Sequence, residues 1–386
     1  MSIRETVLQS LSAVGAQHEA KFYAELFARQ DAETFAMLIL DPRCLKNPLL
    51  EALISALRIL SNLQLSPTLV VGALEDGRTS AKFQAQRLAR DLDKSGVRAL
   101  KLNTASYGLI KEVQKTARSG KMPIMEMTDR RGKMNLSALV TALQPNKIIF
   151  LQPSGGLNED GRRRPNLTIA ELPDFMELGT FSVGQIRFLD CVLDLEKTAV
   201  ARRSYVIASP LNLLGELFTT RGTGTLIRRA AKFKTGKSFK SFSKPDLTRA
   251  LETAFDKRLK PSFFDTPLHA GFVEGEYRGG ALFKMQAGLP YLSKFFVLRE
   301  ARGDGIARDI WGIACDQVPA FLWRSRMENP FNAWYMRKCD GMQRSGDWRI
   351  FWKGLNASEI GDAISAAATA PDDFTPKDFA PDSTES

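Results

Sequence analysis

Glycines 303 and 305 lie in a short turn whose residue types suit the binding of an anion. The turn comprises Arg302, Gly303, Asp304, Gly305, Ile306 and Ala307. A strand-like apolar run at 295–298 precedes it, and a helical pattern follows it. A strand, a glycine-bearing loop and a helix N-terminus in this order present backbone N–H groups where the helix dipole favours negative charge. Glycine also lets a ligand approach the backbone closely, so the turn is predicted to bind an anionic group.

This hexamer fits the pyrophosphate-binding pattern Gln/Arg-x-x-Gly-x-Gly/Ala of the GNAT acetyltransferase superfamily. Further blocks flank it, PYLSKFFV before it and FLWRSRMENPFNAWYMRKCDG and DWRIFWKGL after it. In this order they resemble the acetyltransferase domain of the vertebrate-like N-acetylglutamate synthases, which bifunctional bacterial synthase/kinases also have. The resemblance therefore implies a GNAT-type fold and acyl transfer from acetyl-CoA, with no metal.

The resemblance implies that the acetyl group passes from acetyl-CoA to the amine of L-glutamate. The CoA pyrophosphate would lie on residues 302–307, and a backbone N–H near Val297 or Leu298 would stabilise the developing oxyanion. Lys294 and Arg324 would hold the substrate carboxylates, because a guanidinium can grip a carboxylate at two points. Asn329 would also bind the substrate, through a hydrogen bond from its side-chain amide. Tyr335 would donate a proton to the departing thiolate. Tyr335 and Lys294 are the predicted catalytic residues.

Each of these side chains also has a purely structural interpretation. Lys294 lies in an apolar strand pattern and could be a surface lysine, and Tyr335 could be a core residue whose hydroxyl is satisfied. Arg326 is predicted to make a structural salt bridge. The base that removes the ammonium proton is not visible in the sequence, and a water relay is one possibility.

The first part of the chain alternates short apolar runs with helical patterns. Strands are predicted at 35–40, 69–71, 99–102, 123–127, 148–151 and 204–207, and helices at 47–63, 81–94, 109–119, 136–143, 169–176, 181–195 and 210–218. This alternation predicts a doubly wound, mainly parallel α/β sheet. Residues 3–30 are predicted to form two amphipathic helices broken near Gly15.

Composition shifts divide the chain into four parts. Residues 1–230 are predicted to form the doubly wound domain, and 231–244 a basic linker. Residues 245–366 are predicted to form a mixed-sheet GNAT domain with antiparallel strands at 270–275 and 281–286. The Pro-, Asp- and Ser-rich tail at 367–386 is predicted to be disordered.

The first domain resembles the amino-acid kinase region of the same family through LSAVGAQHEAKFYAELF, ALQPNKIIFL with GGLNEDG, and LLGELFTTRGTGTLIRR. An active kinase carries Lys-x-Gly-Gly at its first strand end, where the glycines cradle phosphates. Here the stretch reads Leu38-Ile39-Leu40-Asp41-Pro42, in which an aliphatic residue replaces the lysine, and Asp41 and Pro42 replace the glycines. We therefore predict no acetylglutamate kinase activity and an architectural or regulatory role.

A second implication of this resemblance concerns the effector L-arginine. In the family, an ELFT segment followed by spaced glycines near the end of the kinase region binds arginine. Glu216, Gly222 and Gly224 stand at those positions here, so an allosteric arginine site is predicted on them. The alternative is an ordinary helix end with a glycine cap.

Composition narrows the class of protein without choosing a function. The net charge of +11 suits anionic substrates such as CoA and glutamate, and it suits equally a solvated basic surface. Four scattered cysteines and two histidines make a zinc site improbable. No apolar run is long enough for a membrane span, and no signal peptide is recognisable. We predict a cytoplasmic homo-oligomer that binds neither membrane nor nucleic acid.

Two rival hypotheses remain beside N-acetylglutamate synthase. The first is a GNAT acetyltransferase that acts on another amine. The second is a non-catalytic, arginine-sensing subunit. The intact set of Arg302–Ala307, Arg324, Asn329 and Tyr335 argues against the second, because a protein without catalysis needs neither a CoA loop nor a proton donor.

Overall fold

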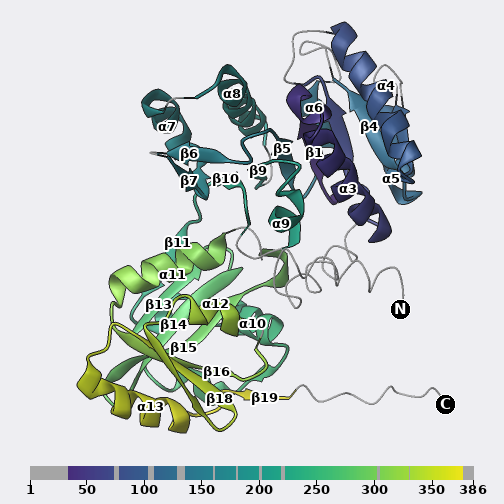
Figure 1. Ribbon diagram of the computed structural model, residues 1–386. Helices are drawn as coiled ribbons and strands as arrows, with labels where there is room; N and C mark the ends of the chain where they lie inside the picture. Colours follow the sequence, from purple (N-terminus) through teal and green to yellow (C-terminus); the bar gives the residue numbers. More distant parts are fainter. Residues whose placement is uncertain are drawn as a thin grey trace, which may run out of the picture. The chain divides into compact units, whose positions relative to one another are not determined.

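A computed structural model describes ten stretches of the chain. They are residues 34–73, 78–102, 108–127, 135–159, 161–179, 181–199, 202–218, 222–301, 305–329 and 331–376. The helices expected at 3–30 lie outside the described residues, as do residues 302–304 of the glycine turn and 377–386 of the tail. The chain divides after Ala230 into two compact units (Figure 1).

The first unit is built on a mainly parallel sheet with the strand order β3-β4-β2-β1-β5-β9-β10-β8. Its strands are β1 Met37–Leu40, β2 Thr68–Val71, β3 Ala99–Leu102, β4 Met122–Glu126, β5 Ile148–Leu151, β8 Asn166–Thr168, β9 Ser204–Ala208 and β10 Thr225–Arg228. A small hairpin joins β6 Leu157–Glu159 to β7 Arg162–Arg164. All pairs of the main sheet are parallel except β9 with β10. The predicted fold class of this unit is confirmed.

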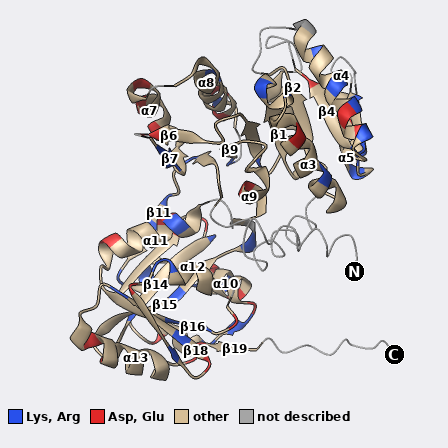
Figure 2. Ribbon diagram, viewed as in Figure 1, with Lys and Arg blue, Asp and Glu red and all other residues tan. Residues whose placement is uncertain are grey.

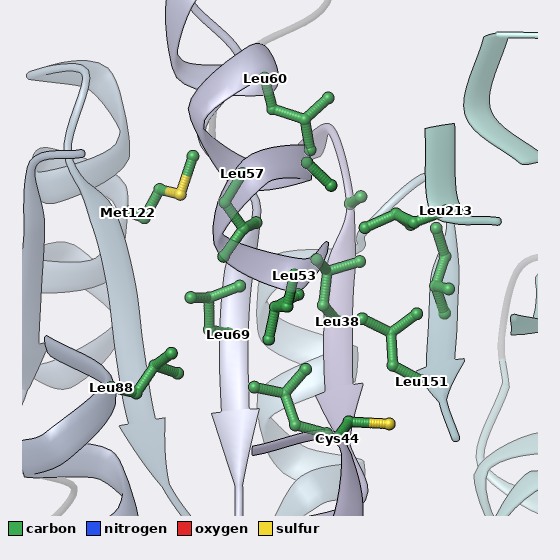
Figure 3. Packing of buried hydrophobic residues seen from close by; sticks show 14 of the residues in the cluster. Leu38, Cys44, Leu53, Leu57, Leu60, Leu69, Leu88, Met122, Leu151 and Leu213 are labelled. Carbon is green, nitrogen blue, oxygen red and sulfur yellow. The ribbon is translucent and has the colours of Figure 1, made fainter. Parts of the chain in front are cut away.

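Helices cover the sheet of the first unit. They are η2 Pro42–Leu45, α3 Leu49–Asn62, α4 Arg78–Lys94, α5 Leu109–Arg118, α6 Leu136–Leu143, η3 Ile169–Glu171, α7 Leu172–Leu178, α8 Val183–Lys197 and α9 Leu213–Phe218. Leucines 53, 57 and 60 of α3 pack on β1 and β2, as Figure 3 shows. Every residue of β1, β2 and β5 is buried, because helices on both faces exclude water from a parallel sheet.

The second unit is a seven-stranded sheet with the order β11-β13-β14-β15-β16-β18-β17. Its strands are β11 Phe233–Gly236, β13 Ala270–Glu274, β14 Gly279–Gln286, β15 Leu289–Val297, β16 Phe321–Arg326, β17 Gly341–Ser345 and β18 Trp348–Lys353. Among the described strands of this second sheet, only β15 and β16 pair in parallel, and their register joins a single pair, Tyr291 with Leu322. Towards its C-terminal end, β15 therefore has its ladder partner on the β14 side.

Helices lie on both faces of this mixed sheet, as expected of the predicted GNAT architecture. They are η4 Phe239–Ser241, α10 Lys244–Phe255, η5 Pro261–Phe264, η6 Arg299–Ala301, α11 Ile306–Gln317, α12 Asn332–Met336, η7 Ala357–Glu359 and α13 Ile360–Thr369. Residues of α11 and α12 share one apolar core with Phe283 and Trp323. Residues of α10 share a core with Leu282 and Phe296, and those of α13 share one with Leu322. Because side chains alternate along a strand, α10 and α13 cover the face opposite α11.

Two stretches differ from the sequence-based expectation. Within the stretch expected to be a linker, β11 pairs antiparallel with β13, because a backbone ladder can form whatever charge its side chains carry. Within the expected disordered tail, α13 continues to Thr369 and β19 Phe374–Thr375 pairs with β12 Arg258–Leu259. Burial of alanines at 363, 366 and 367 explains this order despite the polar composition.

Charged side chains of both signs are interspersed along helices such as α4 and α5 (Figure 2). Within the part of the chain that the structure describes, no helix is long and apolar enough to cross a membrane.

Candidate active site

The N-terminus of α11 has the geometry expected of the glycine turn. Gly305 caps the helix with φ 76°, in the left-handed region that glycine adopts without strain. Its carbonyl oxygen accepts from the N–H groups of Arg308 and Asp309 at 3.0 and 3.2 Å. Ile306 is buried and fixes the first turn against the sheet. The described half of the turn therefore fits an anion at the start of a twelve-residue helix.

The two backbone donors expected near the end of β15 face different ways. The Leu298 N–H donates to the carbonyl oxygen of Arg278 at 2.8 Å and is committed to the sheet. Val297 lies opposite Gly279 in the next register position. Because antiparallel ladders alternate between hydrogen-bonded and non-hydrogen-bonded pairs, the Val297 N–H points away from β14, towards the side of β16.

Tyr335 is a buried residue of α12. Its ring lies 5.7 Å from the Trp323 ring and 6.3 Å from the Phe295 ring, measured between centroids. Burial raises the pKa of its hydroxyl well above the ordinary value. The phenol therefore keeps its proton at neutral and moderately alkaline pH, as a proton donor must. The same surroundings are those of a core aromatic residue.

Asn329 shapes the turn that leads from β16 into α12. Its amide nitrogen donates to the Ser325 hydroxyl at 2.8 Å, and its amide oxygen accepts from the Phe331 N–H at 2.9 Å. Nearby, the Asn332 amide nitrogen donates to the Arg326 carbonyl oxygen at 2.7 Å. Both ends of the Asn329 amide are thus used within the chain.

Lys294 lies in β15 on the face opposite Tyr335. Only 7% of the residue is exposed. Its ammonium forms an ion pair with Asp373 and donates at 3.1 Å to both the carbonyl oxygen and the hydroxyl of Ser293. Burial lowers the pKa of Lys294, whereas the Asp373 carboxylate acts to raise it. The lysine is a buried cation with a partner, so the surface-lysine interpretation is wrong.

Arg324 lies in β16 on the same face as Lys294. Its guanidinium donates to the carbonyl oxygens of Ala367, Ala368 and Pro371 at 3.0, 3.2 and 3.1 Å. It also lies 4.0 Å from the centre of the Trp348 ring. Arg324 therefore holds the end of α13 and the residues that follow it.

Arg326 lies two residues further along β16, and the Trp348 ring is 4.0 Å from it as well. Its guanidinium pairs with Asp347 at 3.6 Å and with Asp372 at 3.7 Å. The predicted structural salt bridge of Arg326 is confirmed.

The sheet separates the predicted proton donor from the predicted carboxylate-binding cations. Tyr335 faces α11, and Lys294 and Arg324 face α10 and α13. Sequence reasoning missed Asp372 and Asp373, which lie in the tail that was expected to be disordered. A signal was present, because Phe374 is a large apolar residue directly after them.

Comparisons with known proteins agree with this geometry. Residues 234–370 match the family described as N-acetyltransferase of N-acetylglutamate synthase. The mitochondrial N-acetylglutamate synthase of Mus musculus is 31% identical over 65% of this chain and 50% of its own length. The second unit therefore matches the N-acetyltransferase domain of N-acetylglutamate synthases, and the chain spans about half the length of the mouse relative.

Two further relatives span almost the whole chain. A protein named acetylglutamate kinase from Xylella fastidiosa is 28% identical over 88% of this chain and 94% of its own length. A solved structure of N-acetylglutamate synthase from Neisseria gonorrhoeae, with coenzyme A and N-acetylglutamate, is 18% identical over 92% of this chain and 97% of that one. Its TM-score of 0.50 supports the shared two-domain fold.

In the first unit, Glu216 accepts hydrogen bonds from the glycine loop at 222–224. One carboxylate oxygen accepts from the N–H groups of Thr223 and Gly224 at 2.8 and 2.9 Å. A Cβ on Gly222 would lie 2.7 Å from that oxygen, and a Cβ on Gly224 would lie 2.0 Å from the Ile207 carbonyl oxygen. The loop is therefore folded onto a buried carboxylate and differs from a simple helix cap.

The end of β1 carries an internal ion pair at the position where the resemblance to amino-acid kinases predicts a phosphate. The Arg43 guanidinium donates to both oxygens of Asp41 at 2.9 and 2.7 Å, and its N–H donates at 2.8 Å. A carboxylate held in this way disfavours a phosphate at the same place.

No group of three or more His, Cys, Asp or Glu residues within the described stretches could hold a metal ion.

Proposed function

We propose that this chain is an N-acetylglutamate synthase, which transfers the acetyl group of acetyl-CoA to the amine of L-glutamate. The observation that carries the proposal is the match of residues 234–370 to the acetyltransferase domain of that family. The left-handed Gly305 at the start of α11 and the buried, protonated Tyr335 support it, because they supply an anion site and a proton donor.

The chain's own groups account for most of the reaction. Residues 302–307 hold the pyrophosphate of CoA, and cations on the opposite face attract the substrate carboxylates. The glutamate amine attacks the thioester carbonyl carbon, and the carbon–sulfur bond then breaks. The departing thiolate takes its proton from Tyr335, which regains one from solvent. The amine loses its proton to water.

The direct test is to incubate purified protein with acetyl-CoA and each amino acid in turn, and to follow the release of free thiol. Glutamate alone should give rapid release, with N-acetylglutamate identified by mass spectrometry. Release with a different amine would favour the alternative GNAT acetyltransferase. No release with any amine would favour the arginine-sensing subunit and overturn the proposal.

Acetylglutamate kinase activity is the other function to examine, because the Xylella fastidiosa relative carries that name. We propose that the first unit lacks it, on the ground that the internally paired Asp41 stands where the family binds phosphate. Incubation with ATP and N-acetylglutamate should release no more ADP than ATP alone. Formation of N-acetylglutamyl phosphate with ADP release above that background would contradict the proposed absence of kinase activity.

L-arginine is the proposed effector of the kinase-like unit. A solved structure of the Neisseria gonorrhoeae enzyme contains coenzyme A and L-arginine. In this chain the loop around Glu216, Gly222 and Gly224 would receive the guanidinium, since a carboxylate accepts more hydrogen bonds than the two it makes here. Isothermal titration with L-arginine should give saturable binding that a Glu216→Ala substitution removes.

Assembly and compartment remain predictions. We expect a homo-oligomer in the cytoplasm. Light scattering of the purified protein and fractionation of cells that express it measure these two properties.

A further inference from the structure

We propose that Asp373 is a positioning residue of the acetyltransferase site, which keeps the Lys294 ammonium charged and directed for a substrate carboxylate. The proposal rests on the proposed function, because it assigns Lys294 the substrate. It adds to the site a residue from the C-terminal segment, here residues 370–376. Asp373 and Lys294 are 79 residues apart in the sequence and meet only in the folded chain.

The backbone of the C-terminal segment is fixed on both sides of Asp373. Its own carbonyl oxygen accepts from the Lys260 N–H at 2.9 Å. The next residue, Phe374, pairs with Leu259 in the β12–β19 ladder, and its ring lies 4.8 Å from the Phe255 ring. Arg324 holds Pro371 on the other side. These contacts give the Asp373 carboxylate a defined position.

The carboxylate of Asp373 joins two residues of β15. It pairs with Lys294 and accepts from the Ser293 hydroxyl at 3.3 Å. Phenylalanine rings enclose the ammonium, with Phe263 and Phe374 centred 5.1 and 5.3 Å from it. Only 8% of the Lys294 side chain and 11% of the Asp373 side chain are exposed. A pair with so little water depends on both partners, because either charge alone would be poorly solvated.

The other charges around Lys294 cannot replace Asp373. Arg324 of β16 is positive and lowers the pKa of Lys294, and Lys294 in turn lowers the pKa of Lys284 of β14. Asp372 is negative, acts more weakly on Lys294, and is paired with Arg326. Asp265 acts on Lys284. Without Asp373, burial and the Arg324 charge would both lower the pKa of Lys294 further and favour the neutral amine, which binds a carboxylate poorly.

In a different role, the Asp373 carboxylate would occupy the place of the substrate carboxylate beside Lys294, and the substrate would displace it. The anchoring of the C-terminal segment on both sides of Asp373 favours a retained residue. The two roles predict opposite effects of Asp373→Asn on the apparent affinity for glutamate, so one experiment separates them.

The experiment compares Asp373→Asn, Asp373→Glu and the control Asp372→Asn with the unchanged protein in steady-state kinetics between pH 6.5 and 9.5. For Asp373→Asn we expect KM for glutamate to rise by about tenfold or more at pH 8, with a smaller change in kcat. The ratio of its KM to that of the unchanged protein should fall as pH falls, because acid restores the Lys294 charge. Asp373→Glu should recover part of the affinity, and Asp372→Asn should stay within about threefold. A lower or unchanged KM in Asp373→Asn would overturn the proposal.

A second measurement does not depend on activity. In protein labelled with ¹³C-lysine, the Cε shift of Lys294, assigned with Lys294→Arg, reports its protonation. We expect its midpoint to lie at least about one pH unit lower in Asp373→Asn than in the unchanged protein. An equal midpoint would refute the positioning role even if glutamate proved not to be the substrate, whereas failure of glutamate-dependent thiol release with a shifted midpoint would refute only the proposed function.

Discussion

A guanidinium nitrogen of Arg324 donates to the carbonyl oxygen of Ala367 at 3.0 Å, which joins strand β16 to the last turn of α13. Helix ends leave carbonyl groups without helical partners, and a cation there also suits the helix dipole. Arg324 supplies both effects and extends its hold to Pro371. A residue predicted from the family to bind substrate is therefore also a structural clamp.

The clamp predicts that Arg324→Lys destabilises the second unit. A lysine keeps the charge but cannot reach several carbonyl oxygens with a planar fork, so we expect a loss of about 1–3 kcal/mol. All five tryptophans lie between residues 311 and 352, so fluorescence during urea unfolding reports on this unit. Arg344→Lys on the exposed part of β17 is the matched control and should change little. Equal stability of the two variants would contradict the clamp.

Tyr335→Phe is predicted to separate the hydroxyl from the ring. The aromatic contacts with Phe295 and Trp323 remain, so stability should change by less than about 1 kcal/mol. The kcat for thiol release should fall by about tenfold or more, with KM for glutamate nearly constant, because the proton donor is lost. A variant that kept the full rate would show that Tyr335 is only a core residue. Because burial raises the pKa of Tyr335, its ionisation should not limit the rate below about pH 10.

Gly222→Ala and Gly161→Ala form a matched pair that tests the loop on Glu216. Both glycines have left-handed φ angles, 64° and 73°, but an added Cβ meets the Glu216 carboxylate at Gly222 and open space at Gly161. We expect about 1 kcal/mol of destabilisation at Gly161 from backbone strain. At Gly222 the clash should add about 1–3 kcal/mol and weaken L-arginine binding. Thermal unfolding followed by circular dichroism measures the stability of both variants. Equal losses of stability would exclude a special role for the Glu216 carboxylate.

Lys284 predicts a pH dependence of stability. Burial lowers its pKa to about 8, below the 10.5 of a free lysine, and its ammonium donates to the Phe263 carbonyl oxygen at 2.7 Å. Between about pH 8 and 10.5 the unfolded chain binds more protons at this site than the folded chain does. The free energy of unfolding from this site should therefore rise with pH across that window and be flat below and above it.

Lys284→Met removes the titrating group and should remove that rise. Urea midpoints of both proteins between pH 7 and 11, followed by tryptophan fluorescence, give the difference directly. The stability of the variant relative to the unchanged protein should be greatest near pH 7 and should decrease towards pH 10.5. A difference that does not vary with pH would mean that Lys284 keeps an ordinary pKa.

Strands and most helices of both units could be predicted because their patterns are local. The runs that became β1 and β5 are apolar throughout, and β2 is apolar after Thr68, which is typical of strands covered on both faces. The glycine turn before α11 was also predictable, because a left-handed residue at a helix start favours glycine. The prediction of disorder was wrong for residues 367–376, since the polar composition concealed Phe374 and the alanines of α13 that the core buries.

The amino-acid sequence by itself predicted the two-domain order, the resemblance to N-acetylglutamate synthases and the set of candidate site residues. Those follow from residue types and short spacings. Only the tertiary structure decided how those side chains are engaged. It paired Lys294 with Asp373 and joined Arg324 to carbonyl oxygens at the end of α13. It also placed the Asn329 amide in hydrogen bonds within its own turn and the Glu216 carboxylate in hydrogen bonds with the loop at 222–224. The physical reason is that a buried charge pairs with whatever segment the fold brings near it. Local sequence patterns do not indicate which distant segment that will be.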